Sequence, residues 1–166
     1  MNTFIEIVNN KRIIPLIIYI ITFALLIASI FLPMGVLANS EMSIYLTKIC
    51  YGGNICSYNI NAYNDNLDNL IKALFSFSII LIIIIVSCSV LLFFNPTAYK
   101  QLGYLLLIIA AIILSLAASV IATVRNLDLD TGTGSILIIV ASIILIVFHL
   151  VSLFFQYSGI PNYLKL

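Results

Sequence analysis

The segment ICYGGNIC, residues 49–56, lies in the longest polar part of a chain that is otherwise rich in aliphatic residues. Its cysteines, Cys50 and Cys56, are separated by five residues, and Gly52-Gly53 is a turn signal between two candidate strands. A short turn can bring two Cα atoms within the roughly 5.5–6 Å typical of a disulfide. We therefore predict a Cys50–Cys56 disulfide that closes a small hairpin in an oxidising compartment.

The same cysteine pair is open to an enzymatic interpretation. Quinone-linked thiol oxidases and vitamin K epoxide reductases are also four-helix membrane proteins with loop cysteines, but they carry a CxxC motif whose close spacing tunes thiolate reactivity. Here five residues intervene, and no second pair outside the spans could relay electrons. A non-enzymatic protein with a structural disulfide is therefore favoured, and a membrane thiol oxidoreductase is the less favoured alternative.

The composition places the rest of the chain in a membrane. Of 166 residues, 63% are hydrophobic and 8% are charged, whereas a soluble domain has about 25% charged residues. The net charge of +1 offers no basic surface for nucleic acid. We expect an integral, multi-pass membrane protein whose surroundings are the lipid bilayer, with no cofactor.

Four runs of the sequence are long and apolar enough to cross a bilayer, whose core needs about 20 helical residues. Pro33 and Pro161 lie near the ends of the first and last runs, and Asn95-Pro96 separates the second from the third. The sequence predicts a single all-α membrane domain over residues 1–166, a four-helix bundle with spans at 13–37, 69–94, 100–124 and 132–157. The polar segment 38–68 is expected to form a loop with a small β-hairpin or sheet.

The distribution of charge gives an orientation. Four spans put both termini on one side, and the positive-inside rule favours the side richer in Lys and Arg as cytoplasmic. With cytoplasmic termini, Lys and Arg divide four to three in favour of the cytoplasm, and five of the six acidic residues lie outside. The cysteine pair agrees with this orientation. We therefore predict cytoplasmic N- and C-termini and an extracytoplasmic 38–68 loop, at the plasma membrane.

A stripe of small residues lies on one face of the third span. Small residues let helices approach closely in membranes. We predict that this stripe packs inside the bundle, with a role in oligomerisation as the alternative. The stripe consists of Ala111, Ser115, Ala118 and Ala122, spaced by four, three and four.

The spans carry little chemistry. No charged residue lies deep in any of them, which argues against ion pumps and proton-coupled transporters. His149 has no His, Asp or Glu partner three or four residues away, so no metal site is predicted. We expect His149 to be a structural histidine bonded to a backbone carbonyl or a serine, with a functional switch as the alternative. Cys88 is expected to behave as a small apolar residue.

Two segments together resemble the claudin superfamily, which includes the peripheral myelin protein and the epithelial membrane proteins. LTKIC (46–50), followed by Cys56, is similar to that family's Gly-Leu-Trp, two residues and Cys, followed by a second Cys. LIKA (70–73) is similar to its Leu-x-Arg-Ala opening of the second helix. Thr47 stands at the tryptophan position and Tyr45 at the glycine position, and the gap between the cysteines is shorter than is usual in the family.

The resemblance implies a left-handed four-helix bundle with a small external sheet held by the Cys50–Cys56 disulfide, and it places Lys72 where the family keeps a basic residue at the outer rim. We expect a non-enzymatic tetraspan that organises membranes or mediates cell adhesion and lateral contacts, as at cell junctions. Its partners would be further copies of itself or other membrane proteins. A small structural subunit of a larger membrane complex is the alternative.

The expected contact surface lies in the 38–68 loop. Tyrosine suits contacts because it buries a large area and keeps a polar tip, although an interfacial aromatic belt is an equal alternative for these tyrosines. The contact residues are predicted to be Tyr45, Leu46, Tyr51 and Tyr58.

Overall fold

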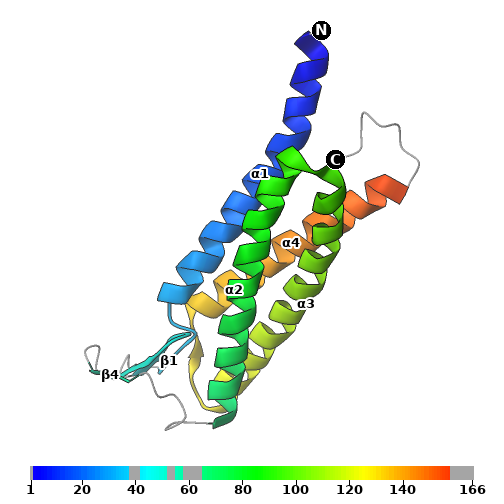
Figure 1. Cartoon of the computed structure of the whole chain (residues 1–166). Coiled ribbons are helices and arrows are strands. Elements are labelled where there is room, and N and C mark those ends of the chain that lie inside the picture. Colours follow the sequence, from blue (N-terminus) through cyan, green and yellow to red (C-terminus); the bar gives the residue numbers. More distant parts are fainter. Residues whose placement is uncertain (1, 38–41, 52–54, 58–64, 158–166) are drawn as a thin grey trace.

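Four long helices form the body of the molecule (Figure 1). The computed structural model describes residues 2–37, 42–51, 55–57 and 65–157, and their side chains apart from those of 2–12, 96–97 and 155–157. Each helix contains an apolar stretch long enough to cross a membrane. The predicted four-helix membrane bundle is therefore confirmed. The helices are α1 (Asn2–Phe31), α2 (Asp65–Phe94), α3 (Pro96–Asn126) and α4 (Thr133–Tyr157).

The first two helices differ in extent from the prediction. The α1 helix begins at Asn2, well before its span, and ends at Phe31 rather than at 37, because Pro33 follows and Gly35–Val36 leaves the helix to become a strand. The α2 helix begins at Asp65 rather than at 69. Its first turn contains two acidic residues, which interact favourably with the positive end of the helix dipole.

The α3 helix begins four residues earlier than predicted because Asn95 caps it. The Asn95 side chain accepts a hydrogen bond from the backbone N–H of Ala98 at 3.1 Å, and Pro96 occupies the first turn, where its missing N–H costs little. The helix ends at Asn126, two residues beyond the predicted 124. The α4 helix agrees with its prediction to within one residue.

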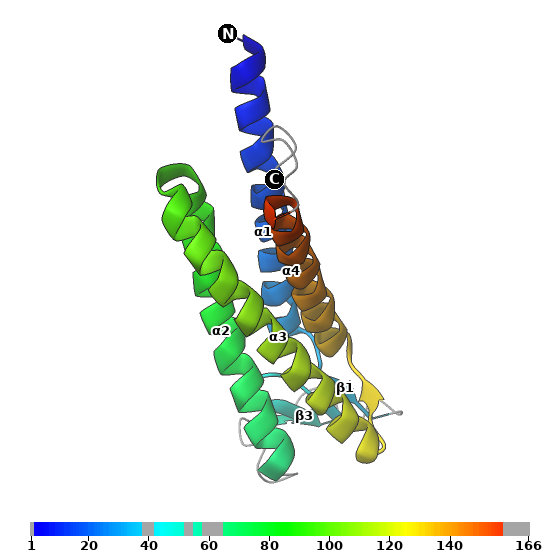
Figure 2. The same ribbon diagram turned by 90° about the vertical axis from the view of Figure 1, so that its right-hand side faces the viewer.

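A five-stranded antiparallel sheet lies at one end of the bundle (Figures 1 and 2). We call this the sheet end, and we call the opposite end, where α1 begins and α4 ends, the terminus end. The predicted small sheet is confirmed, but two of its strands were not predicted. They are the short strands β1 and β5, which pair with each other. In the order β4-β3-β2-β1-β5, the strands are β1 (Gly35–Val36), β2 (Met42–Ile44), β3 (Ile49–Tyr51), β4 (Ile55–Ser57) and β5 (Asp130–Thr131).

Two glycines connect the start of α4 to the end of α1 through direct backbone contact. The Gly132 N–H donates to the carbonyl of Met34 at 2.9 Å, and the Gly134 N–H donates to that of Pro33 at 2.8 Å. A Cβ atom at position 132 would lie 2.1 Å from the Pro33 carbonyl oxygen. The sheet end therefore depends on glycine at this position, because any side chain would force the two backbones apart.

The buried face of α3 is not the predicted one. The four small residues of the predicted stripe, Ala111, Ser115, Ala118 and Ala122, are all exposed, so the prediction that they pack inside the bundle is wrong. The buried face begins one position earlier, which is a rotation of about 100° around the helix. It consists of Ala110, Ile113, Ala117, Val120 and Val124.

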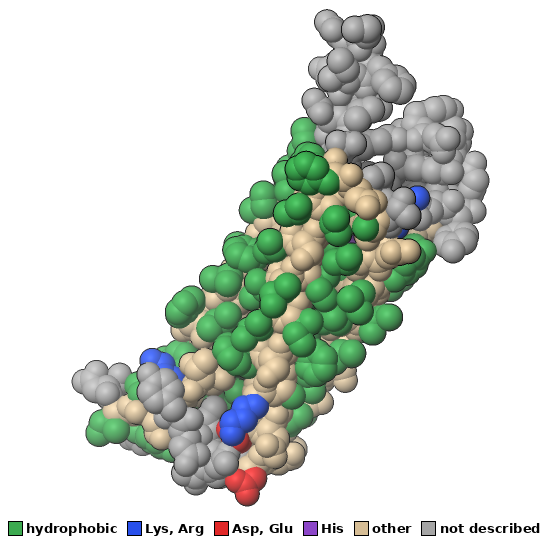
Figure 3. All heavy atoms as spheres, in the orientation of Figure 1, with side chains coloured by type: hydrophobic (Ala, Val, Ile, Leu, Met, Phe, Trp, Pro, Cys, Tyr) green, Lys and Arg blue, Asp and Glu red, His purple; other side chains and the backbone are tan. Residues whose placement is uncertain are grey.

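The surface has the polarity of a membrane protein. On the face shown in Figure 3, hydrophobic side chains cover the middle of the bundle, and charged side chains gather near its two ends. Many large apolar side chains are exposed on all four helices. Because lipid is as apolar as a protein core, such exposure is expected within the bilayer.

Candidate functional site

The β3–β4 hairpin is fixed by the disulfide. Cys50 and Cys56 are directly opposed in the antiparallel pair, and their sulfur atoms lie 2.09 Å apart. The predicted bridge is therefore confirmed. The neighbouring pair in the same register is Tyr51 and Ile55, so the disulfide holds these two side chains next to each other.

The hairpin presents an apolar pair to its surroundings. Tyr51 is 41% exposed and Ile55 is 74% exposed. In β3, Ile49 and Cys50 are buried, whereas all three residues of β4 are exposed. The β4 strand is also the outermost strand on its side of the sheet. An exposed apolar pair on an edge strand is a typical contact surface, and we call these two residues the hairpin pair.

The other predicted contact residues have different environments. Leu46 is only 3% exposed and belongs to the hydrophobic core, so its prediction as a contact residue is wrong. Leu46 supplies packing instead of a free surface. Tyr45 is half-buried, and the ammonium of Lys48 lies 5.4 Å from its ring centroid, within cation–π range. Tyr58 lies outside the described residues.

Lys72 forms an ion pair near the start of α2. Its ammonium lies 2.6 Å from Oδ2 of Asp68, one helical turn earlier. The side chain of Lys72 is 64% exposed, whereas that of Asp68 is 2% exposed. Lys72 therefore compensates a buried carboxylate at the sheet end, in addition to presenting a positive charge at the surface.

A buried polar cluster joins three helices at the terminus end. The hydroxyl of Tyr19 on α1 lies 3.1 Å from that of Tyr99 on α3 and 3.3 Å from Nε2 of His149 on α4. Nδ1 of His149 lies 2.9 Å from the carbonyl oxygen of Leu145, and because a carbonyl only accepts, this nitrogen carries the proton. The prediction that His149 bonds to a backbone carbonyl is confirmed.

The sequence analysis did not predict Tyr19 and Tyr99 as members of this cluster. The signal was nevertheless present, because Tyr19, Tyr99 and His149 each lie near the terminus end of an otherwise apolar span. Buried hydroxyl and imidazole groups need hydrogen-bond partners, and in a bundle they find them at the same depth on neighbouring helices. Cys88, the described free cysteine, is buried as expected.

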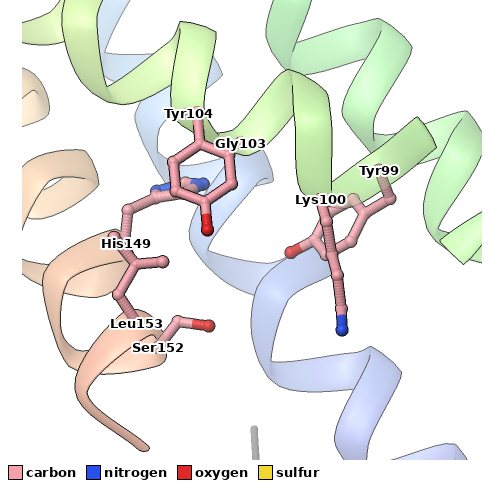
Figure 4. Close-up of a pocket in the computed structure, with 7 residues that line it drawn as sticks. All are labelled: Tyr99, Lys100, Gly103, Tyr104, His149, Ser152 and Leu153. Carbon is pink, nitrogen blue, oxygen red and sulfur yellow. The ribbon is translucent and has the colours of Figure 1, made fainter. Parts of the chain in front are cut away.

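A small pocket of about 30 Å³ opens beside this cluster, between α3 and α4 (Figure 4). The hydroxyls of Tyr99, Tyr104 and Ser152 point into the space between the helices, and the Lys100 side chain extends past it. The helices lie close together at Gly103, where a Cβ atom would lie 3.4 Å from the His149 ring, an ordinary van der Waals distance. The pocket therefore combines hydroxyl groups with one cation.

The described residues contain no group of three His, Cys, Asp or Glu side chains placed to hold a metal ion. Comparison of the chain with models of known protein families, with curated proteins and with solved structures finds no match. The fold itself defines a class: an integral membrane protein with four spans and a disulfide-bonded sheet at one end of its bundle.

Proposed function

We propose that this protein is a non-enzymatic tetraspan that makes contacts with further copies of itself, or with other membrane proteins, through the β3–β4 hairpin. The observation that carries the proposal is the exposed hairpin pair, Tyr51 and Ile55, beside the Cys50–Cys56 disulfide. The resemblance to the claudin superfamily supports it, because it also implies a non-enzymatic contact role for this loop. Membership of that family is part of the proposal.

The geometry of the hairpin favours binding for two physical reasons. A disulfide limits the conformations of a short hairpin, so less entropy is lost when a partner is bound. An edge strand also offers backbone N–H and C=O groups to an extended segment of a partner. Burying on the order of 150 Å² of apolar surface would contribute about 4 kcal/mol before the costs of association. Such a weak contact suits many copies in one membrane, where contacts add up.

The proposed orientation places the termini in the cytoplasm and the sheet end outside the cell, at the plasma membrane. A disulfide persists in an oxidising compartment, which supports an extracytoplasmic sheet. Acidic residues flank the membrane at this end, and they do not favour the cytoplasmic side. The acids described there are Asp65, Asp68, Asp128 and Asp130.

Vesicle aggregation tests the proposal. Vesicles that carry the purified protein are expected to aggregate, as measured by light scattering, and the double variant Tyr51→Ser/Ile55→Ser is expected to lose most of this aggregation. The matched control is Thr47→Ser, which alters an exposed residue of the same loop outside the hairpin. Unchanged aggregation by a folded double variant would refute the hairpin as the contact surface.

A second candidate function is a structural subunit of a larger membrane assembly. It is favoured by the stripe of small residues on α3, which is exposed and so is free to pack against a foreign helix. Purification in mild detergent separates the candidates. The alternative would be favoured if foreign subunits copurify in stoichiometric amounts and are lost in the variant Ala118→Leu/Ala122→Leu. They should be kept in the control variant Val140→Leu, which changes an exposed position of α4. Self-association alone would favour the contact protein.

A further inference from the structure

The pocket at the terminus end gathers hydrogen-bond donors from two helices. Lys100 and Tyr104 come from α3, and Ser152 comes from α4. Lys100 is exposed. The ion pair found among the described residues joins Lys72 to Asp68 and does not include Lys100. A cation near hydroxyl groups is a suitable environment for an anion with several oxygen atoms.

The charge beside the pocket is set by Lys100. The pocket lies beside the first turns of α3, which begins at Pro96, and beside the last turns of α4, which ends at Tyr157, so the partial positive charge of one helix end is offset by the partial negative charge of the other. The four acids whose side chains the structure describes all lie at the sheet end, far along the bundle from this pocket. No described carboxylate therefore offsets the charge of Lys100 at the terminus end.

The position and size of the pocket limit the kind of anion. The span of α3 begins at Ala98, so Lys100 lies near the boundary of the bilayer, at the level of lipid head groups. The pocket holds about 30 Å³, which is room for one or two heavy atoms and not for a sugar ring or a sterol. A phosphate group that enters from the head-group layer with one or two oxygen atoms fits both limits.

We propose that this pocket binds the phosphate of an anionic phospholipid in the leaflet at the terminus end. The ammonium of Lys100 and the hydroxyls of Tyr104 and Ser152 donate to the phosphate oxygens, while the acyl chains remain in the bilayer. Basic pockets between membrane helices at head-group level bind anionic lipids by the same physics. This site lies at the opposite end of the molecule from the hairpin pair, so it does not depend on the proposed contact function.

Native mass spectrometry of the full-length protein in detergent tests the site. Phosphatidylglycerol and phosphatidylcholine with identical acyl chains are titrated. We expect one phosphatidylglycerol to bind about tenfold more tightly, because both lipids offer a phosphate but the choline ammonium of phosphatidylcholine is repelled by Lys100. Lys100→Gln should abolish this preference, and Lys100→Arg should retain it. Ser152→Ala should weaken binding of phosphatidylglycerol about threefold, the effect of losing one neutral hydrogen bond.

The matched control is Lys48→Gln, which removes the same charge at the sheet end. A preference that survives in Lys100→Gln, or that is lost equally in Lys48→Gln, would overturn the proposal, because net charge or another surface would then explain it. The last experiment measures whether inorganic phosphate competes with phosphatidylglycerol for the pocket. If it competes with phosphatidylglycerol at equal concentration, the pocket recognises free phosphate and the assignment to a lipid is wrong.

Discussion

Replacing Gly132 by alanine is expected to destabilise the sheet end of the protein. The new Cβ atom would lie 2.1 Å from the carbonyl oxygen of Pro33 and 2.7 Å from the carbonyl carbon of Met34. Non-bonded heavy atoms need about 3.5 Å. The start of α4 and the end of α1 must therefore separate by about 1 Å or more, and the contacted atoms belong to the backbone and cannot rotate away.

The energetic cost follows from the bonds that span this contact. The Gly132 N–H and the carbonyl of Met34 are 2.9 Å apart, so a separation of about 1 Å breaks their hydrogen bond. The bond from the Gly134 N–H to Pro33 shares the same backbone segment. Two lost bonds and the accompanying strain amount to about 3 kcal/mol of unfolding free energy. For a chain of this size, this loss lowers Tm by about 6–12 °C.

Labelling of Cys88 measures this change. The thiol of Cys88 is buried and the other two cysteines form the disulfide, so a fluorogenic maleimide in detergent reports unfolding on heating. Gly103→Ala is the matched control, since its Cβ would lie 3.4 Å from the His149 ring and alanine favours the interior of α3 by about 1 kcal/mol. The reasoning is refuted if Gly132→Ala melts within about 2 °C of the native protein, or if both variants lose the same stability.

Two further predictions use the same thermal assay. Tyr19→Phe removes the hydroxyl that joins Tyr99 to His149 and should cost about 1–2 kcal/mol, given about 0.6 kcal/mol for a typical bond of this kind in a membrane and two bonds lost. A smaller cost than that of Tyr99→Phe would show that Tyr19 is not the centre of the cluster. Lys72→Gln should cost more than Asp68→Asn, because it leaves the buried Asp68 carboxylate without its ion-pair partner, whereas Asp68→Asn leaves only an exposed ammonium. The reverse order would show that Lys72 does not compensate the buried carboxylate.

The sequence was sufficient to predict the helix bundle and the central strands of the sheet. Long uncharged runs have one stable solution in lipid, a helix whose backbone groups are paired internally. The two cysteines around Gly52-Gly53 also defined the β3–β4 hairpin. The strands β1 and β5 could not be predicted, because each has only two residues. β5 pairs with β1 across almost 100 positions of sequence, and β1 lies between β5 and β2. Such strands leave no local pattern.

The packing face of α3 shows a second limit. The helix contains two adjacent pairs of small residues, Ala110-Ala111 and Ala117-Ala118, so two stripes one residue apart both contain alanine, and the predicted stripe contains more small residues than the buried one. In a soluble protein the polar face would decide between them, but within lipid both faces are apolar. The buried face takes Ala110 and Ala117, because the larger residues that share their stripe fill the space between the helices.

How well each candidate site could be predicted from the sequence depends on whether its residues lie in a polar or an apolar segment. The hairpin lies in the one polar segment, where residue type is informative. The polar cluster and the pocket depend on which helices are neighbours, and that information is long-range. Tyr19, Tyr99 and Ser152 are common residues near membrane boundaries, and they are brought together by the packing of α1, α3 and α4 against one another.

The α1–α4 pair connects the two ends of the molecule mechanically. The pair is joined at the terminus end by the bond between Tyr19 and His149, and at the sheet end by the backbone bonds of Gly132 and Gly134. Strand β1 follows α1 and strand β5 precedes α4, so the sheet continues directly from this pair. A force that a partner exerts on the hairpin pair is therefore transmitted through the sheet to the α1–α4 pair. It follows that Gly132→Ala should also weaken vesicle aggregation, although it leaves the hairpin pair unchanged, whereas Gly103→Ala should not.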